Sequence, residues 1–329
     1  MRDIFEYRDN FTKYNLVKSV LQYGDTASCP KPKISVIMPV YGNPKFFVHS
    51  FNSVIHQDAD FSYEVIVVDN TPLNDTKTDV LKIIENANIP YVFYYRNKEN
   101  IGMTGNWNRG IELARAELIT FCHDDDMLYP QCLSTLLKLH NKYPNKWIIP
   151  ACRVIDESIS YPLDNTAFFN FRGKECLTFD KIDIFMGNPT NGVGCLFYKK
   201  HMLEFGGYNE DYYPSQDNAL HIKYVFQKGA VQYRNKLYCY RITKTNESNT
   251  VYKKFITNGL FYCKCMTPFM GYPSFVTKLL MHTYRVNITS TMELVWARKG
   301  SPSLKPTMMD VIINKCLEYR KTLKKLGFI

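Results

Sequence analysis

Strand-like and helix-like segments alternate four times within about 95 residues, and this alternation constrains the fold more than any other feature of the sequence. The strand-like segments read ISVIMPV, YEVIVVD, YVFYYRN and ELITF, and amphipathic segments with helical spacing lie between them. Such alternation predicts parallel strands joined by right-handed crossovers, with helices covering the sheet. We therefore expect an α/β fold with a mostly parallel central sheet flanked by helices.

The pattern outside this region suggests a chain in three parts. FTKYNLVKSVLQ, at residues 11–22, has helical spacing, and the segment after it contains two prolines and is typical of a linker. Beyond residue 250 the pattern is helical and closes with MMDVIINKCLEYRKTLKKL. We expect an N-terminal helix and linker (1–32), a main domain (33–250, with halves 33–130 and 131–250) and a helical C-terminal extension (251–329).

The net positive charge of the chain lies near its end. Lys and Arg outnumber Asp and Glu by 41 to 31, and residues 251–329 alone hold 13 basic and 3 acidic side chains. The basic residues there are mixed with Phe, Tyr and Trp296, which suits either a solvated face or an anionic membrane surface. No nucleic-acid recognition motif accompanies the charge, so no nucleic-acid partner is expected.

Cysteine usage and hydropathy indicate the compartment. The ten cysteines are scattered without a C-x-x-C pair, as is typical of reduced thiols in the cytosol. The N-terminus lacks a secretory layout, and no apolar run approaches the roughly 18 to 20 residues that span a bilayer. We expect a cytoplasmic protein whose contact with the inner face of the cell membrane is peripheral, through its basic end.

Three consecutive carboxylates, Asp124, Asp125 and Asp126, follow the fourth predicted strand in FCHDDDMLYP. Adjacent like charges repel one another, so we expect a cation or hydrogen-bond donors beside them. Carboxylates at a strand end suit a hard cation such as Mg²⁺ or Mn²⁺, together with substrate phosphates. The alternative is a cap for a helix that begins near Pro130.

Two further segments follow strand ends, where sheets of this kind bind their ligands. Asp69, in VVDN, is either a hydrogen-bond acceptor for a base or ribose or a turn former. NKENIGMTGNWNRG lacks the Lys of a phosphate loop and the G-x-G-x-x-G pattern, so it indicates neither an ATPase loop nor a nicotinamide site. It predicts a turn that opens a helix, either as plain structure or as a source of N–H groups for a diphosphate.

A later carboxylate and two histidines complete the candidates. Asp217, in YYPSQDNAL, opens a helical pattern and is either a site residue or a helix cap. His123 and His221 are more typical of packed or solvent-facing side chains than of metal ligands, although His221 shares a helix face with Asp217.

In order along the chain, ISVIMPVYGNP, YEVIVVDN, NKENIGMTGNWNRGI, FCHDDDMLYP and FGGYNEDYYPSQDNAL resemble the family 2 glycosyltransferases, which have the GT-A fold. The resemblance covers about residues 33–230 and implies a nucleotide-sugar-binding half followed by an acceptor half. It implies that Asp124 and Asp126 hold the metal and that Asp217 is the base that activates the acceptor. The residues implied to bind the nucleotide-diphosphate sugar are Pro39, Tyr41, Asp69, Asn100, Gly102, Asn108 and Asp125.

The chain departs from the family pattern at two positions. His123 stands where Asp is frequent, and Gln216 stands where the family has Glu before the base.

The residue types fit glycosyl transfer. A leaving diphosphate gains charge as the bond to sugar C1 breaks, and a cation at Asp124–Asp126 would stabilise that charge while Asp217 takes the acceptor proton. One such displacement inverts the anomeric centre. We expect a metal-dependent inverting glycosyltransferase acting on a glycan or lipid-linked acceptor in surface polysaccharide or glycoconjugate biosynthesis. The alternatives are a carboxylate-dependent glycoside hydrolase and a non-catalytic module that binds sugar nucleotides or membranes.

Overall fold

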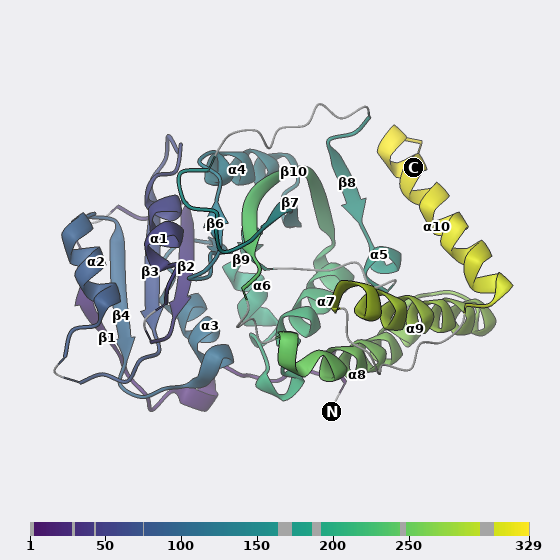
Figure 1. Cartoon of the computed structure of the whole chain (residues 1–329), viewed down its shortest axis with the longest axis horizontal. Coiled ribbons are helices and arrows are strands. Elements are labelled where there is room, and N and C mark those ends of the chain that lie inside the picture. Colours follow the sequence, from purple (N-terminus) through teal and green to yellow (C-terminus); the bar gives the residue numbers. More distant parts are fainter. Residues whose placement is uncertain are drawn as a thin grey trace.

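A six-stranded sheet forms the centre of the first half of the chain (Figure 1). The structure, a computed structural model, describes residues 3–27, 30–42, 44–74, 76–163, 173–185, 192–243, 248–296 and 306–328. The strand order is β1 (Ser19–Tyr23), β4 (Val92–Asn97), β3 (Tyr63–Asp69), β2 (Ile34–Val40), β5 (Leu118–Phe121) and β9 (Phe197–Tyr198). The four inner strands pair in parallel, and β1 and β9 pair antiparallel at the two edges. The predicted α/β fold with a mostly parallel sheet is confirmed.

Three helices connect the parallel strands and cover the sheet, as the sequence pattern predicts. They are α1 (Phe47–Ile55), α2 (Asp79–Ala87) and α3 (Gly102–Leu113). All seven residues of β2 are buried, as expected for a parallel strand covered on both faces. α3 lies very close to β2, because a Cβ atom at Gly110 would come within 2.3 Å of Ile37 Cγ2. The glycine lets this helix approach the sheet.

Three of the four strands of a second sheet come from residues after 130. Its strands are β6 (Met127–Leu128), β10 (Ala230–Arg241), β7 (Trp147–Ile155) and β8 (Cys176–Phe179). β10 is parallel to β7 and antiparallel to β6 and β8. Helices of the same region are α4 (Cys132–Lys142), α5 (Lys181–Phe185), α6 (Lys199–Glu204) and α7 (Gln216–Lys228). The central strand β10 therefore pairs with β6, although more than 100 residues of the chain separate the two strands.

The C-terminal extension is helical, as predicted. α8 (Ser248–Met266), α9 (Ser274–Trp296) and α10 (Met308–Leu326) lie on the side of the molecule opposite β1 and α2 (Figure 1). α8 packs on α9, and α10 packs on α9 and β8. Among the described residues, no helix is both long enough and apolar enough to cross a bilayer.

The predicted helix at residues 11–22 is wrong. A short 3-10 turn, Thr12–Tyr14, leads into the strand β1, which pairs with the edge of β4. The helical spacing was misleading because its apolar positions are not buried together, and Leu16 is 97% exposed. Arg109 on α3 donates to the carbonyl oxygens of Tyr14 and Val17 and holds the segment beside the sheet. Pairing with β1 also provides hydrogen-bond partners for backbone groups of β4 that would be unpaired at an exposed sheet edge.

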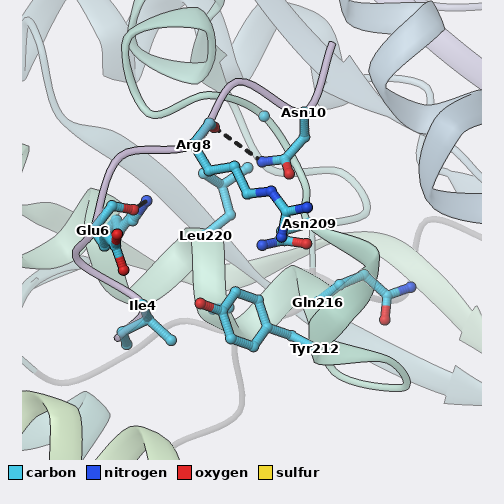
Figure 2. Close-up of a pocket in the computed structure, with 11 residues that line it drawn as sticks. Ile4, Glu6, Arg8, Asn10, Asn209, Tyr212, Gln216 and Leu220 are labelled. Carbon is cyan, nitrogen blue, oxygen red and sulfur yellow. Dashed lines mark hydrogen bonds between the residues drawn. The ribbon is translucent and has the colours of Figure 1, made fainter. Parts of the chain in front are cut away.

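The residues before this turn contact the second half of the molecule. The backbone N–H of Asn10 donates to the Gly206 carbonyl at 3.0 Å, and its side-chain amide donates to the same oxygen at 2.9 Å. Figure 2 shows Arg8 and Asn10 of this segment together with Tyr212 and Gln216 from the region where α7 begins. The N-terminal segment thus supports the loop that leads into α7.

Candidate active site

A cleft of about 460 Å³ lies at the carboxyl ends of β2, β3 and β5. Parallel sheets bind ligands at these ends, and the volume is typical of a ligand site. Six of the predicted site residues line it: Pro39, Tyr41, Asn100, Gly102, Asp124 and Asp125. The cleft is also lined by residues that we did not predict as ligands, namely Val40, Asn70, Met103, Asn106, Trp107 and His123.

Two of the predicted site residues lie behind the cleft, with their polar groups bonded to the protein. Asp69 is fully buried and accepts hydrogen bonds from the Thr71 N–H at 2.8 Å and the Tyr94 hydroxyl at 2.6 Å. Asn108 exchanges two hydrogen bonds of 2.8 Å with the backbone of Tyr208, which joins α3 to the loop before α7. Both side chains hold the walls of the cleft in place.

Arg241, at the end of β10, supplies donors to the turn that holds the three adjacent aspartates. Its backbone N–H donates to Asp126 Oδ1 at 2.9 Å, and its Nε donates to the Asp125 carbonyl at 2.8 Å. Its Nη1 donates to the carbonyls of Asp156 and Ile159 at 2.7 and 2.8 Å. We expected positive charge or donors here but did not identify Arg241. It reaches Asp126 only because β10 pairs with β6, and no local sequence signal reports that pairing.

His123, Asp125 and Asp126 form a group that could hold a metal ion. One ligand atom from each residue lies within 4.8 Å of the others. Asp126 is 1% exposed, and its Oδ2 lies 3.7 Å from His123 Nδ1 without a hydrogen-bond partner in the described part of the chain. A buried carboxylate oxygen without a partner is costly unless a proton or cation satisfies it. Burial and the charge of Asp125 accordingly raise the pKa of Asp126.

The helix-cap alternative for the three aspartates is wrong. The next helix, α4, begins at Cys132, and its capping residue is Gln131. β6 starts immediately after Asp126 and pairs with β10. The carboxylates therefore occupy a turn between two strands.

Asp124 lies outside the group of possible metal ligands, although it lines the same cleft. Burial raises its pKa to about 7, and the negative charges of Asp125 and Asp69 act in the same direction. This carboxyl group is therefore close to both the cluster and the end of β3.

Asparagine side chains fix the start of α3 at the cleft. Asn70 Nδ2 donates to Asn100 Oδ1 at 2.7 Å, and the same oxygen accepts the Gly102 N–H at 2.8 Å. Asn70 Oδ1 accepts the Ile101 N–H at 3.0 Å. Gly102 has a φ of +73°, a left-handed conformation that favours glycine. The predicted turn is confirmed, and it places the N-terminus of a twelve-residue helix at the cleft, where an anion is favoured.

Asp217 lies in the first turn of α7. The capping residue of this helix is Ser215, so the cap alternative for Asp217 is wrong. Its Oδ1 accepts the Asn218 N–H at 2.8 Å. Burial raises the pKa of Asp217 to about 6. A carboxylate with a pKa near neutrality is well suited to accept a proton.

A row of aromatic rings connects the cleft with the surroundings of Asp217. Trp107 stacks on His123 with 5.6 Å between ring centroids, and it packs edge-on against Tyr208 at 5.2 Å. Burial raises the pKa of Tyr208, and the nearby charge of Asp217 adds to the shift. Asp217 does not line the cleft itself, but its charge reaches Tyr208, the ring at the far end of this row from the carboxylate cluster.

Two neighbours of Asp217 on α7 are buried. His221 is fully buried and packs on Trp147 at 4.6 Å between centroids, so of the two expected placements, packed or solvent-facing, the structure shows the packed one. Gln216 is also fully buried, and neither atom of its amide has a hydrogen-bond partner within the described segments.

The chain is similar in sequence to several curated proteins. The chain is 25% identical over 233 residues to an uncharacterised protein of Mycobacterium tuberculosis, with 67% of this chain and 70% of that protein covered. It is 29% identical over 186 residues to the GalNAc(5)-diNAcBac-PP-undecaprenol beta-1,3-glucosyltransferase of Campylobacter jejuni, with 56% and 57% covered. The match thus spans somewhat more than half the length of the second relative.

A solved structure and a family match complete the comparison. S. aureus TarS 1-349 in complex with UDP-GlcNAc has a TM-score of 0.57 at 14% identity, with 80% of this chain and 74% of that one covered. At this identity the likeness concerns the fold alone. Residues 35–204, slightly more than half of the chain, match the family described as Glycosyl transferase family 2. The chain therefore belongs to the family 2 glycosyltransferases and has their GT-A fold.

Proposed function

We propose that the protein is a metal-dependent inverting glycosyltransferase that moves a sugar from a nucleotide-diphosphate sugar to a glycan or lipid-linked acceptor. The proposal is carried by the cleft, which brings an exposed tyrosine, a helix N-terminus and a carboxylate cluster to one end of the sheet. The tyrosine suits the base, the helix N-terminus suits the diphosphate, and the carboxylates suit the cation that accompanies it.

The donor side of the cleft is assigned first to Tyr41, which is 61% exposed and whose ring can stack on a planar base. Pro39, Asn100 and Gly102 belong to the same surface. TarS has been crystallised with UDP and with UDP-GlcNAc, which supports a uridine-type donor here. Asp69 supports this surface from behind the cleft, through its hydrogen bonds with Thr71 and Tyr94.

The residues present fit a divalent cation such as Mg²⁺ or Mn²⁺. The unpartnered Oδ2 of Asp126 lies beside His123 and Asp125, and carboxylate oxygens are preferred ligands of both ions. We therefore assign Asp126 and Asp125 to the cation, with His123 as a third ligand, and place Asp124 towards the donor. A cation bound there would act as a Lewis acid for the charge on the leaving diphosphate.

Asp217 is assigned the role of general base. Its deprotonated carboxylate takes the proton of an acceptor hydroxyl while that oxygen attacks sugar C1 and the bond from C1 to the diphosphate oxygen breaks. Attack from the face opposite the leaving group inverts the anomeric centre. The buried amide of Gln216 occupies the position before the base, where the family has Glu.

We place the acceptor on the Asp217 side and propose that it is carried by a lipid in the assembly of a surface polysaccharide or glycoconjugate. The name of the Campylobacter jejuni relative supports this class of acceptor, because it includes an undecaprenol carrier. A position at the cytoplasmic face of the membrane would bring the enzyme to such an acceptor.

The proposal is tested by nucleoside diphosphate release from a panel of nucleotide sugars, with Mn²⁺ and a mixture of undecaprenol-linked glycan acceptors. We expect turnover by the wild type, a loss of at least about 100-fold in Asp217→Asn, and a comparable loss in Asp126→Asn or with chelator. Asp60→Asn, a change at an exposed carboxylate, is the matched control and should keep full activity. Full turnover by Asp217→Asn would reject the assigned base.

An assay of the same protein without nucleotide distinguishes the proposed function from the glycoside hydrolase alternative. Cleavage of aryl glycosides that depends on Asp217 would favour hydrolysis, whereas the proposed enzyme leaves them intact. Tight binding of a nucleotide sugar with no turnover on any acceptor would favour a non-catalytic module.

A further inference from the structure

The C-terminal helix α10 turns six of its apolar side chains away from the protein, while Ile313, Leu317 and Leu323 are half-buried. Met308, Ile312 and Tyr319 are 76%, 48% and 66% exposed. A helix that packs on a domain normally buries its apolar stripe and exposes its polar side. We call the exposed apolar side chains the outer face of α10, and they are Met308, Met309, Val311, Ile312, Tyr319 and Leu326.

The side of α10 that contacts α9 is polar. Asp310 is 1% exposed and accepts hydrogen bonds from Thr283 Oγ1 at 2.9 Å and from His282 Nδ1 at 3.0 Å. One turn further, the side-chain amides of Asn287 and Asn314 bond reciprocally at 2.9 and 3.1 Å. These bonds fix the rotation of α10 about its own axis.

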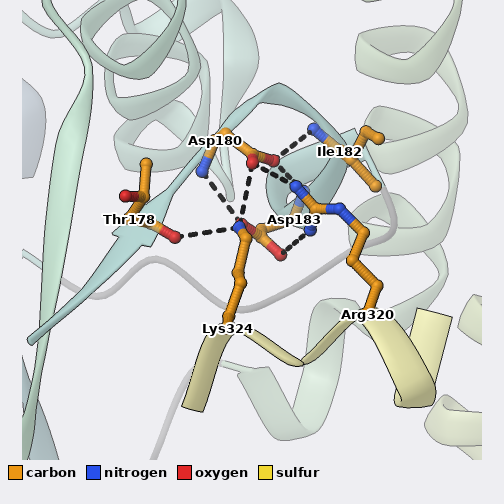
Figure 3. A network of polar contacts seen from close by, with 6 residues as sticks. All are labelled: Thr178, Asp180, Ile182, Asp183, Arg320 and Lys324. Carbon is orange, nitrogen blue, oxygen red and sulfur yellow. Dashed lines mark hydrogen bonds and ion pairs between the residues drawn. The ribbon is translucent and has the colours of Figure 1, made fainter. Parts of the chain in front are cut away.

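The C-terminal end of α10 is held by ion pairs (Figure 3). Lys324, which is 7% exposed, donates to Asp180 Oδ2 at 2.9 Å and to Asp183 Oδ2 at 2.8 Å. It also donates to the Thr178 carbonyl at 2.9 Å, and Arg320 pairs with both aspartates. Because polar contacts secure the inner side along the length of the helix, the outward direction of its apolar side is built into the fold.

We propose that the outer face of α10 binds the surface of an anionic lipid bilayer. The exposed apolar residues recur at spacings of three, four and seven, so they form one stripe that can enter the headgroup region. Lys315 is exposed on the same helix between Ile312 and Tyr319, and its long side chain can reach a lipid phosphate while the stripe is inserted. This rests on the proposed function in one respect, since it names the surface by which the enzyme would meet a lipid-linked acceptor.

Charge favours a lipid surface over a second copy of the chain as the occupant. Residues 251–329 carry 13 basic and 3 acidic side chains. Two such regions brought together would repel each other, whereas anionic headgroups complement the charge. Apolar insertion and charge attraction then act on the same helix.

Sedimentation with phosphatidylcholine vesicles, with and without phosphatidylglycerol, tests the proposal without donor or acceptor. We expect the wild type to bind only the anionic vesicles, and less tightly at high salt. Ile312→Asp with Tyr319→Asp should weaken binding at least tenfold, and Lys315→Glu should weaken it about tenfold. Leu16→Asp, a change at a 97% exposed apolar residue near the N-terminus, is the control and should bind like the wild type.

A second measurement reports on the helix itself. Cys316 is exposed on α10 and can carry an environment-sensitive fluorophore, with labelled Cys316→Ser protein as the blank. We expect a blue shift on addition of anionic vesicles. The proposal is overturned if the wild type does not bind, if the Ile312/Tyr319 variant binds normally, or if the label does not shift. It is also overturned if the same variant instead dissociates a dimer in solution. Because vesicle binding needs no sugar transfer, each result is independent of the catalytic test.

Discussion

Arg241 and Asp126 are 115 residues apart in the chain, yet the backbone N–H of the first donates to Oδ1 of the second at 2.9 Å. The contact engages one oxygen of the buried carboxylate and leaves Oδ2 beside His123, at 3.7 Å from its Nδ1. The Arg241 side chain meanwhile bonds the carbonyl of Asp125. One residue of β10 therefore shapes the turn to which we assign the cation.

Replacing this side chain should affect both stability and metal binding. Arg241→Met removes the donors for the carbonyls of Asp125, Asp156 and Ile159 and leaves these groups poorly satisfied. We expect the free energy of unfolding in urea to fall by about 3 kcal/mol, and Mn²⁺ affinity to fall at least tenfold. Arg285→Met, at an exposed position, is the control. Unchanged unfolding and Mn²⁺ titrations would show that the turn does not depend on Arg241.

The pH dependence of turnover should follow Asp217. Its pKa is raised by burial to about 6, and only the deprotonated form can accept a proton. We therefore expect kcat/KM to increase about tenfold per pH unit below 6 and to level off above it. The residual activity of Asp217→Asn should lack this step. A profile with the same step in both proteins would assign the titration to another group.

The exposed ring of Tyr41 should contribute to donor affinity. Tyr41→Ala removes a base-stacking platform, which is worth about 1–3 kcal/mol in comparable contacts. We expect KM for the nucleotide sugar to rise by about tenfold with little change in kcat, because the base does not react. Tyr7→Ala changes a tyrosine of similar exposure, 64%, near the N-terminus and should leave KM unaltered. A fall in kcat alone would place the ring at the reacting centre.

The attachment of α10 should be sensitive to acid. Burial alone would raise the pKa of Asp180, but the hydrogen bond and charge of Lys324 and the charge of Arg320 outweigh it and lower the pKa. A lowered carboxyl pKa contributes stability above the unfolded value of about 3.9, and the contribution is lost as pH falls through the folded value. Amide exchange in residues 308–326, measured relative to β2, should therefore accelerate below about pH 4.

Lys324→Met should accelerate the same exchange already at neutral pH, because it leaves two carboxylates without their buried partner. Lys315→Met, on the exposed side of α10, serves as its control. Equal protection in all three proteins would mean that the ion pairs do not hold the helix.

Local pattern was sufficient to predict the parallel sheet and its helices. The buried strands Ile34–Val40 and Tyr63–Asp69 are nearly continuous apolar runs, and each ends at a polar residue or turn that marks the edge of the cleft. Such features depend only on a few residues that are neighbours in the sequence. The place where the strands end, and with it half of the residues that line the cleft, could be predicted for the same reason.

Contacts that depend on distant pairing were not predictable in this way. Arg241 has no local signature, and neighbouring residues did not reveal the hydrogen bonds that hold Asp69 and Asn108 inside the protein. Residues 11–22 have the spacing of a helix, but the open edge of β4 and the guanidinium of Arg109 favour a turn and a strand. The outward apolar face of α10 likewise becomes visible only when its inner contacts are known.

The position of Arg241 has a consequence for biogenesis. During synthesis, Asp124–Asp126, the cleft residues Asn70 and Asn100, and even Asp217 leave the ribosome before β10 does. β10 is the strand that orders the aspartate turn. Up to that moment the nascent polypeptide carries the groups to which we assign catalysis without the arrangement that would let them operate, so the proposed site is completed late, among the final events in the maturation of this domain.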